Sequence, residues 1–571
     1  MKIFSTVLLK VVIVFIILVT AIVIVFFTRH YFKNNKFISS IVVPHHNLVA
    51  DKRAEFFREL RDTIPAPATI ILVSPNHYGA GKGDIQVSKE IWHVRDGELK
   101  PDEVVIDRLR STALASEEPY SFTNEHGIYA ILGDIKKNFP EARLVPLMLK
   151  EVSAVRLAEL EKTLREVCTD CLLIASVDFS HYQPALLAEL HDDLTRRALQ
   201  KLDAVALLEK SEVDSGSALA LMSLWAKSHS TRRFEEYAHT NSGVIYEDPD
   251  VETTTHIFGW YEKGEEVVPE PEVGFIFAGD AMFGRYVHRV YQSDFKKIFS
   301  QLGDRVFWGT DAAIINLEGA ITTEPIVDSP EPNNIIFKFS PRIVEALTFL
   351  RVNGASLANN HSTNAGPEGT ATTRKLLEEV GIKVFGGATD SGLHNVVIFQ
   401  GEGLKLAVIG MNLTFPGQTP EGAVVIIKKL KEDANTKVAV FAHWGVEYVE
   451  QHNATQSAAA HTWIDAGADM VIGAHPHVIQ DAEIYKGKPI FYSLGNFIFD
   501  QVYPETQVGL MLAGKFTESS IKLFALPIRL TNYQPQLIRG DEKKTVLDQL
   551  YFPLKDYVIK TPAGDGIEIE N

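Results

Sequence analysis

Short apolar runs alternate with amphipathic stretches along most of the chain. Runs such as "TIILVS" (69–74) and "CLLIAS" (171–176) have the length and apolar character of buried strands. By contrast, "HDDLTRRALQKLDAVALLEK" (191–210) repeats its apolar residues at the spacing of a helix. This alternation predicts layered α/β domains rather than an all-α or all-β fold.

One acidic stretch interrupts the pattern near the middle of the chain. The segment "YEKGEEVVPEPEVGF" (261–275) holds five glutamates and two prolines, between a finished apolar run and a new one. Such a composition is typical of a linker. We therefore expect a first domain over 37–262, a linker over 263–272, a second domain over 273–540 and a charged tail over 541–571.

The first apolar run differs in kind from the others. Residues 11–27, "VVIVFIILVTAIVIVFF", contain no charge, and with their neighbours they are long enough to span a bilayer. A cleaved signal peptide is the alternative, but "TRHYFKNNKF" follows in place of a small-residue cleavage site. We expect an N-terminal transmembrane helix within 1–36, in a single-pass membrane protein whose domains lie outside the cytoplasm.

Length and charge restrict the partners. A chain of 571 residues is too long for a single core. Its net charge of -17 argues against nucleic acid and against polyanions held by bulk charge. A phosphate or carboxylate substrate would need a local positive charge, such as a bound cation.

The only two cysteines are Cys168 and Cys171. A lone CxxC pair is compatible with a disulfide, a redox pair or half of a zinc site. No second CxxC completes a zinc site, and the pair does not open a helix as a thioredoxin-type motif would. A structural or disulfide role is favoured, which suits an oxidising compartment.

In the second half, apolar runs repeatedly end in residues that bind metals. In α/β sheets, ligand sites form at the carboxyl ends of strands, so we expect these side chains to meet. Carboxylate, amide and imidazole donors without thiolate suit Mn, Fe or Zn in an open, catalytic site rather than a structural zinc cage. The donors are Asp280, Glu318, Asn360, His361, His443, His475 and His477, with Asn496 ending a further run.

The sequence "GAHPHV" places two histidines on either side of Pro476. In an extended chain, residues two apart point to the same face. His475 and His477 are therefore expected to face one pocket, although a pair of surface histidines in a loop is the alternative.

Six ordered motifs in this half closely resemble the CapA family, which is associated with poly-γ-glutamate capsule synthesis. The resemblance covers roughly 273–515 and implies a calcineurin-like metallophosphoesterase fold of four α/β/β/α layers. The motifs are "FAGDAMFGR", "INLEGAIT", "SLANNHSTNAGPEG", "FAHWGVEY", "GADMVIGAHPHV" and "FYSLGNFIFD".

The resemblance also implies roles for these residues. Asp280 and His477 would hold one metal. Asn360, His443 and His475 would hold a second, with Glu318 bridging and His361 as general acid or transition-state stabiliser. Three departures bear on this assignment: Met282 replaces a ligand histidine, Glu318 replaces a shorter aspartate, and Asn364 replaces an aspartate that supports the site.

A sparser set of the same kind occurs in the first half. Two or three convergent imidazoles would suit a single iron, copper or zinc ion, although Asp178 could simply orient His181. The motifs "IVVPHHN", "LVSPNHYGAG" and "SVDFSHY", over about 40–262, resemble the Memo family, whose fold is similar to extradiol dioxygenases. The candidate residues are His45, His77, His126, Asp178 and His181.

Within that resemblance, His45 and His77 are the implied ligands. Ser215 stands where Memo proteins carry a ligand cysteine, which argues against Memo-like redox chemistry and favours binding.

Taken together, we expect a membrane-anchored protein of capsule or surface-polymer synthesis, with one or two divalent metals in a hydrolase centre acting on a phosphoester or amide bond. Its partners would be the membrane and the polymer synthesis or export machinery. Two alternatives remain open: a non-catalytic polymer- or partner-binding protein, and an oxidoreductase that uses the N-terminal pocket.

Overall fold

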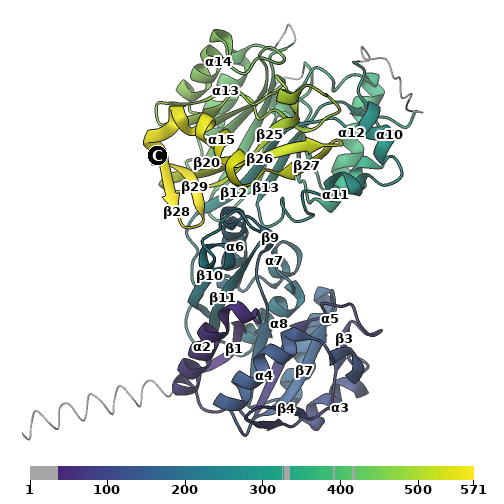
Figure 1. Ribbon diagram of the computed structural model, residues 1–571, viewed down its shortest axis with the longest axis vertical. Helices are drawn as coiled ribbons and strands as arrows, with labels where there is room; N and C mark the ends of the chain where they lie inside the picture. The colour runs from purple at the N-terminus through teal and green to yellow at the C-terminus, as the bar shows by residue number, and fades with distance from the viewer. Residues whose placement is uncertain (1–35, 325, 327–334, 390–391, 415–417, 571) are drawn as a thin grey trace, which may run out of the picture.

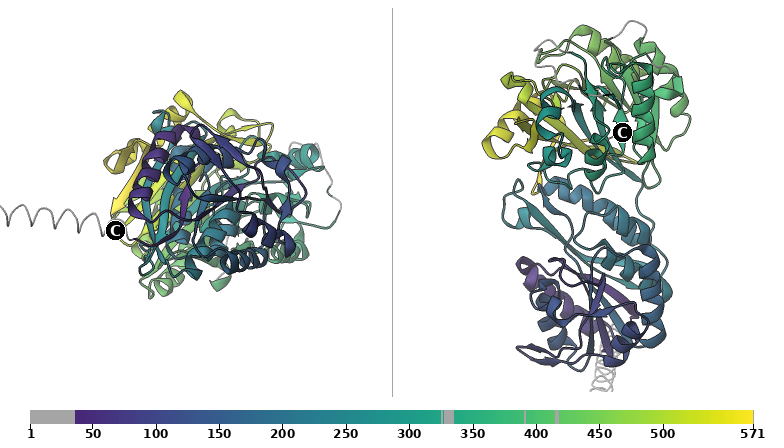
Figure 2. Two further views of the ribbon diagram at one scale, coloured as in Figure 1. Left: turned by 90° about the horizontal axis from the view of Figure 1, so that it is seen from below. Right: turned by 90° about the vertical axis from the view of Figure 1, so that its right-hand side faces the viewer.

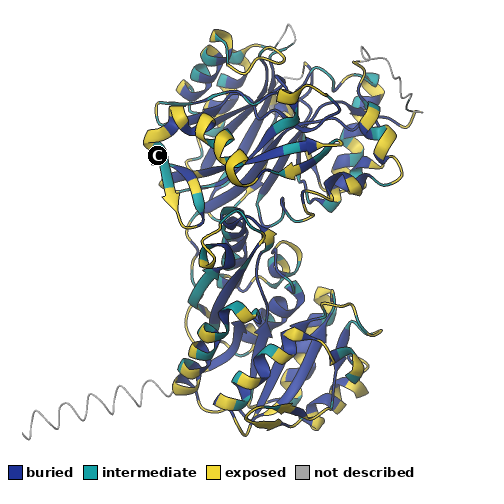
Figure 3. Ribbon diagram, in the orientation of Figure 1, coloured by how far each residue is buried: buried dark blue, intermediate teal, exposed yellow. Residues whose placement is uncertain are grey.

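The computed structural model describes residues 36–324, 326, 335–389, 392–414 and 418–570. Two α/β units follow each other along the chain and stack end to end (Figure 1). In both, the strands are buried and the helices present exposed residues on the outside (Figure 3).

A sheet of nine strands forms the centre of the first unit, in the order β10-β11-β1-β8-β2-β7-β3-β6, with β9 paired to β11. Strands β1, β8, β2 and β7 run parallel, and β11 and β10 add an antiparallel edge. A separate hairpin joins β4 (Trp92–Val94) and β5 (Gly97–Leu99). The sheet strands are β1 (Ile38–Val43), β2 (Thr69–Pro75), β3 (Ile85–Val87), β6 (Ser116–Glu117), β7 (Arg143–Leu149), β8 (Cys171–Ser176), β9 (His181–Gln183), β10 (Arg233–Asn241) and β11 (Thr253–Glu262).

Helices cover both faces of this sheet, which explains why a central strand such as β2 is apolar throughout. Ile70 and Leu72 of β2 pack toward α2 and α4, while Ile71 and Val73 pack toward α3, α5 and α8. The helices are α2 (Ala50–Thr63), α3 (Glu103–Ser111), α4 (His126–Asn138), α5 (Ala154–Val167), α6 (Ala185–Gln200), α7 (Ala204–Glu209), α8 (Gly216–Ser228) and α9 (Ser242–Ile245), with 3-10 turns η1 (Asn47–Val49) and η2 (Pro119–Phe122).

The second unit contains two large sheets. One has the order β17-β16-β13-β12-β25-β26-β29-β28, with β24 beside β12 and β27 beside β26; the other has the order β18-β19-β20-β21-β23-β22. The strands of the first are β12 (Glu272–Ala281), β13 (Ala312–Leu317), β16 (Gly354–Ser356), β17 (Lys383–Phe385), β24 (Asn496–Ile498), β25 (Val508–Thr517), β26 (Ser520–Thr531), β27 (Gln534–Leu537), β28 (Val558–Thr561) and β29 (Gly564–Glu570). Those of the second are β18 (Val396–Gln400), β19 (Lys405–Asn412), β20 (Thr436–His443), β21 (Met470–Ala474), β22 (Ala482–Tyr485) and β23 (Lys488–Phe491), and a small pair joins β14 (Ala320–Ile321) to β15 (Lys338–Phe339).

The two sheets pack face to face, as Phe277 of β12 and Phe441 of β20 share one apolar core. Helices α11 and α12 cover the outside of the first sheet, and α13 and α14 cover the outside of the second (Figure 2). The unit therefore has four layers. Its helices are α10 (Arg285–Tyr291), α11 (Ile343–Phe349), α12 (Gly366–Glu379), α13 (Pro420–Leu430), α14 (Ala454–Asp465) and α15 (Gly540–Tyr551), with 3-10 turns η3 (Phe295–Phe299), η4 (Gly392–Asn395), η5 (Pro504–Gln507) and η6 (Phe552–Tyr557).

The last residues are part of the second unit. The sequence suggested a weakly patterned tail over 541–571, but α15 occupies its first part and β29 pairs with β26. Ile567 and Ile569 are buried in the core between the sheets. The alternating apolar residues of this short segment form a strand because β26 provides an edge with unpaired backbone groups.

Helix α6 joins the two units. Leu187 and Leu190, on one of its faces, are buried in the core of the second unit. From the same helix, Arg197 forms ion pairs with Glu272 at 3.0 Å and with Asp311 at 2.9 Å. The interface thus combines apolar burial with partly buried ion pairs.

No helix within the described ranges is both long and apolar enough to cross a membrane. The longest helix there, α6, has sixteen residues, which is shorter than a bilayer requires. The apolar run 11–27 lies outside the described residues. The expected fold class is corrected to two mixed α/β units, and the expected single-pass membrane location is not supported.

The cysteine pair closes a small loop at the start of β8. Cys168, at the end of α5, forms a disulfide with Cys171. Of the uses that the sequence left open, the structure therefore shows the disulfide.

Candidate metal centres

The expected donors of the second domain converge where strands of both sheets end. Asp280 lies near the end of β12 and Glu318 directly follows β13, while His443 ends β20. Next to Asp280, Gly279 allows the backbone to approach Gly495 closely, because a side-chain carbon there would lie 1.9 Å from the Gly495 carbonyl oxygen. This contact brings the end of β12 into the site.

Asp280, Glu318 and His477 form the first group of donors. Their ligand atoms all lie within 4.8 Å of one another. His477 Nδ1 lies 3.1 Å from Asp280 Oδ2, and its Nε2 lies 3.8 Å from Glu318 Oε1. All three side chains are buried.

Asn360, His443 and His475 form a second group beside the first. Asn360 Oδ1 lies 2.8 Å from His443 Nε2, and the rings of His443 and His475 have their centres 4.6 Å apart. The two groups meet at Asp280, whose Oδ1 lies 4.0 Å from His443 Nδ1. All six expected ligands therefore surround one site.

The two carboxyl groups of the site titrate differently. Burial and the charge of Asp280 raise the pKa of Glu318 well above its ordinary value. Burial opposes ionisation of Asp280 as well, but hydrogen bonds from His477, Asn316 and the His475 N–H lower the pKa of Asp280. Like charges this close cannot both ionise cheaply without a cation between them.

The imidazoles of His443 and His475 are held in the neutral form that binds metals. Burial lowers the pKa of His475 to about 4, and burial together with the neighbouring histidines lowers the pKa of His443 well below its ordinary value. Within the described residues, Glu318 Oε1, Glu318 Oε2 and His475 Nδ1 are buried without a hydrogen-bond partner. Unpaired buried oxygens and nitrogens of this kind fit a divalent cation.

His361 lies at the edge of the site. Its ring stacks on Phe337 at 3.9 Å, and its Nε2 lies 3.8 Å from Glu318 Oε1. Asn364 Oδ1 accepts a hydrogen bond from the Phe337 N–H at 2.7 Å and lies 2.9 Å from His361 Nδ1. An amide oxygen only accepts, so Nδ1 carries the proton and Nε2 presents a lone pair. Burial lowers the pKa of His361 to about 4.

The backbone around Pro476 is not extended. β21 ends at Ala474, and His475 and His477 have φ angles of 95° and 60°. The expectation that simple strand alternation would align the two rings is wrong, since both residues lie in the left-handed region. They nevertheless face one pocket, with ring centres 6.0 Å apart.

Sequence reasoning missed two residues of this site. Asn316 donates to Asp280 Oδ1 at 2.7 Å and lies 3.2 Å from His443 Nδ1, so it links the two groups. Glu447 forms a further possible ligand set with His475 and His477. Asn316 lies near the end of β13, the strand that Glu318 directly follows, which was an available signal. Met282 is turned away, as its sulfur accepts a hydrogen bond from the Gly284 N–H at 3.0 Å.

The first domain holds a second cluster. One ring nitrogen from each of His45, His77 and His126 lies within 4.8 Å of the others. A ring nitrogen of His45 and carboxylate oxygens of Asp178 and Asp214 form a second group within the same distance. His45 Nε2 lies 3.3 Å from Asp178 and 3.2 Å from Asp214. His181 lines the adjoining cavity but is in none of these groups.

Carboxylates control the charge of this cluster. Burial alone would lower the pKa of His77, but hydrogen bonds to Asp214 and Glu125 raise it to about 10. Glu125 caps helix α4 by accepting from the Gly127 N–H and also lies 2.6 Å from His77 Nδ1. His77 is thus a cation when no metal competes for it.

Asp214, which sequence reasoning missed, takes the place expected for its neighbour Ser215. The Ser215 hydroxyl caps helix α8 by accepting from the Ala218 N–H, so it is not a ligand here. Asp214 is buried in the cluster, and its Oδ1 has no partner within the described ranges. A carboxylate directly before a serine cap was the available signal. Imidazole and carboxylate donors with an unpaired oxygen fit a single metal ion.

Comparison with known proteins assigns both halves of the chain. Residues 274–501 match the family described as bacterial capsule synthesis protein PGA_cap, and residues 20–219 match the family described as Memo-like protein.

Individual relatives agree with this division. The capsule biosynthesis protein CapA of Bacillus anthracis is 26% identical over 54% of this chain and 82% of its own length. The PGA biosynthesis protein CapA of Bacillus subtilis is 27% identical over 54% of this chain and 87% of its own length. A MEMO1 family protein of Pyrobaculum arsenaticum is 27% identical over 25% of this chain and 53% of its own length. The chain thus combines a Memo-like domain with a CapA-like domain.

Proposed function

We propose that the CapA-like domain is a divalent-metal hydrolase centre that acts in the synthesis of a capsule or another surface polymer of the poly-γ-glutamate type. The names of its relatives, a capsule biosynthesis protein and a PGA biosynthesis protein, support this role. The machinery of polymer synthesis or export would then be its partner.

One observation carries the metal assignment. Glu318 is fully buried, and neither of its oxygens has a hydrogen-bond partner among the described residues, beside Asp280 and the imidazole of His477. An unpaired buried carboxyl group is costly, so its presence is explained most simply by a cation that it binds. Mn, Fe or Zn suits these oxygen and nitrogen donors, in one or two positions.

The roles of the side chains follow from their positions. Asp280, Glu318 and His477 would hold one metal, and Asn360, His443 and His475 the other. A bound divalent cation would polarise the bond to be cleaved and favour deprotonation of the attacking water. Asn316 keeps Asp280 and His443 in place through its hydrogen bonds. His361 Nε2, with its lone pair toward the site, would accept a proton before it could act as an acid.

The Memo-like domain supports a separate proposal of a single metal ion. His45, His77 and Asp214 would be its ligands, with His126 and Asp178 within reach. Glu125 would orient His77 through Nδ1 and leave Nε2 for the metal.

Metal analysis of the purified protein tests the first centre. We expect at least one transition metal per chain, and we expect His443→Ala combined with His475→Ala to remove the metal of the CapA-like domain. His452→Ala combined with His461→Ala is the matched control, since these histidines pair with Asp481 and Glu483 outside the site. Undiminished metal in the first double variant would refute the assigned ligands.

An activity assay separates catalysis from binding. A phosphodiester and a γ-glutamyl peptide, each with added manganese, are suitable substrates. We expect Asn360→Ala and His443→Ala to lower turnover by at least about a hundredfold, as expected when a positioned electrostatic group is lost. Turnover that both variants retain would exclude this centre as the catalyst.

A non-catalytic role in binding the polymer is the second candidate. It is favoured by Met282, which stands in a ligand position and satisfies the Gly284 N–H instead. Metal binding without turnover of either substrate, combined with retention of poly-γ-glutamate on the immobilised protein, would select this alternative.

A further inference from the structure

A large cavity lies where the two domains meet. Its volume is about 860 Å³. The first domain contributes His77, Asp214 and Lys150 to its wall, and the second contributes Arg305 and Arg351. The cluster of the Memo-like domain therefore opens toward arginines that belong to the CapA-like domain.

Arg305 and Arg351 differ in their hydrogen-bond partners. Arg305 donates to Glu212 Oε1 at 2.8 Å and to the Val213 carbonyl at 3.2 Å, so its charge is neutralised and it holds the segment before Asp214. Arg351 lies flat on Trp308, with its guanidinium carbon 3.3 Å from the ring centre. Its Nη1 is buried without a hydrogen-bond partner among the described residues.

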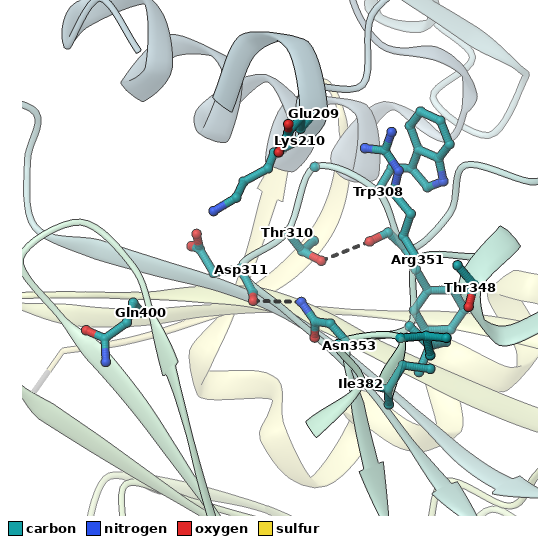
Figure 4. Close-up of a pocket in the computed structure, with 15 residues that line it drawn as sticks. Glu209, Lys210, Trp308, Thr310, Asp311, Thr348, Arg351, Asn353, Ile382 and Gln400 are labelled. Atoms are coloured by element: carbon teal, nitrogen blue, oxygen red, sulfur yellow. Dashed lines mark hydrogen bonds between the residues drawn. The ribbon is translucent and has the colours of Figure 1, made fainter. Parts of the chain in front are cut away.

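Figure 4 shows the neighbouring pocket on the other side of this contact. The Arg351 side chain lies beside Trp308, and Glu209 and Lys210, at the end of α7, approach from the first domain. None of the carboxylates in the described ranges, including that of Glu209, forms an ion pair with Arg351. Burial and the neighbouring charge of Arg305 lower the pKa of Arg351 to about 10, so it is still protonated at neutral pH.

Glu151, Glu209 and Glu212 are close enough for their charges to favour the protonated form of Arg351, but none of them forms an ion pair with it. A partly buried cation without such a direct contact is costly. The ring of Trp308 offsets part of that cost, but the outer edge of the guanidinium remains unpaired. The planar fork of an arginine matches the two oxygens of a carboxylate or a phosphate. The missing partner is therefore an oxyanion that enters from the cavity.

We propose that this cavity is a binding site, shared by the two domains, for a small organic anion whose carboxylate or phosphate group pairs with Arg351. The anion extends from Arg351 toward the His77 imidazole, and Lys150 contributes from the rim. This site goes beyond the proposed hydrolase centre and does not depend on it, since none of the Glu318 group lines the cavity.

Calorimetric titration of the full chain tests the site. Tri-L-glutamate and pyrophosphate serve as the two probes, after chelation of metals so that coordination cannot contribute. We expect at least one probe to bind at millimolar concentration or below, and the stronger one identifies the oxyanion. Binding of neither would overturn the proposal.

Three variants locate the binding. Arg351→Gln should weaken it by about 10- to 100-fold, the effect of losing a charged hydrogen bond, and Arg351→Lys should recover part of it. Arg58→Gln removes the same charge from an exposed position on α2 and should change nothing. Equal weakening by Arg351→Gln and Arg58→Gln would mean bulk charge alone, and would also overturn the site.

A further variant covers the case in which Arg351→Gln fails to fold, as judged by its circular dichroism melting curve. Lys150 lies on the rim of the cavity, where its ammonium group donates to the Gly81 carbonyl. Lys150→Gln should weaken binding about 2- to 5-fold, as for an exposed ion pair. Unchanged affinity in that variant would count against the site.

Discussion

At the scale of single residues, the CapA-like site is arranged around charge. Asp280 stays ionised because His477, Asn316 and a backbone N–H donate to it, whereas Glu318 receives no donor at all. Two adjacent carboxyl groups with opposite pKa shifts are typical of sites with divided roles. The difference between them arises from hydrogen bonds, not from burial, since both are fully buried.

Glu318→Gln tests this arrangement in metal-free protein. The pKa of Glu318 is raised in the folded state, so its contribution to stability is present below about pH 4.5 and is lost as pH rises through the folded value. At neutral pH the glutamine variant should therefore be more stable by about 1–3 kcal/mol. Thermal melting at acidic and neutral pH, with a chelator, measures the effect.

Addition of manganese should reverse that order, because the wild-type protein keeps the Glu318 carboxylate and gains more binding energy than the variant. Identical pH dependence of melting in the two metal-free proteins would contradict the raised pKa.

Asn364→Asp should change the charge of His361. Asn364 is neutral and leaves the pKa of His361 at about 4. An aspartate in hydrogen-bond contact favours imidazolium, so the pKa of His361 should rise toward its ordinary value of about 6.5. Titration of the imidazole signals by NMR in metal-free protein follows the shift, and Asn364→Ser is the control. A pKa that stays near 4 in the aspartate variant would show that burial alone determines it.

At the scale of elements, helix α6 is part of the first domain in the sequence, but its Leu187 and Leu190 pack in the core of the second domain. Leu187→Ala should remove apolar packing from the second domain, because Leu187 is fully buried there. We expect a loss of about 2–5 kcal/mol in the free energy of unfolding, measured by urea denaturation of the full chain. Val155→Ala, at a 71% exposed position on α5, should change it by no more than about 0.5 kcal/mol.

If both substitutions had the same small effect, α6 would not contribute to the second core as its burial indicates.

At the scale of the whole molecule, the interface and not the linker holds the two domains together. Residues 263–268 are largely exposed, whereas the interface buries Leu187 and Leu190 and pairs Lys515 with Asp193 at 2.6 Å. A glutamate-specific protease should therefore cut this linker without separating the domains. Size-exclusion chromatography at moderate salt should show one peak that contains both fragments, and two separate peaks would contradict a stable interface.

The composite cavity belongs to this scale too. Arg351 and His77 come from different domains and meet only through the way the domains stack. No sequence motif identifies Arg351. Its role is inferred from the hydrogen-bond partner that it lacks, not from a pattern of residues.

Much of the fold was accessible from local pattern. Apolar runs located many of the strands, and the ends of these runs indicated candidate donors that lie close together in the structure, because a strand's period and its terminus are local properties. The linker in the glutamate-rich stretch stays a prediction. Two expectations are not supported by the described structure. The expected tail contains α15 and β29, and β26 pairs with residues 567–570. The apolar run that suggested a transmembrane helix lies outside the described residues, and no described helix is long and apolar enough to cross a membrane.

By itself, then, the sequence determined the α/β class and the chemistry available at the ends of several apolar runs. Only the tertiary structure decided which donors meet, that Asp214 and not Ser215 enters the first cluster, and that the Glu318 oxygens stay unpaired. The physical reason is that the coordination of a cation depends on distances of a few ångströms between distant segments, and those distances follow from packing rather than from local sequence.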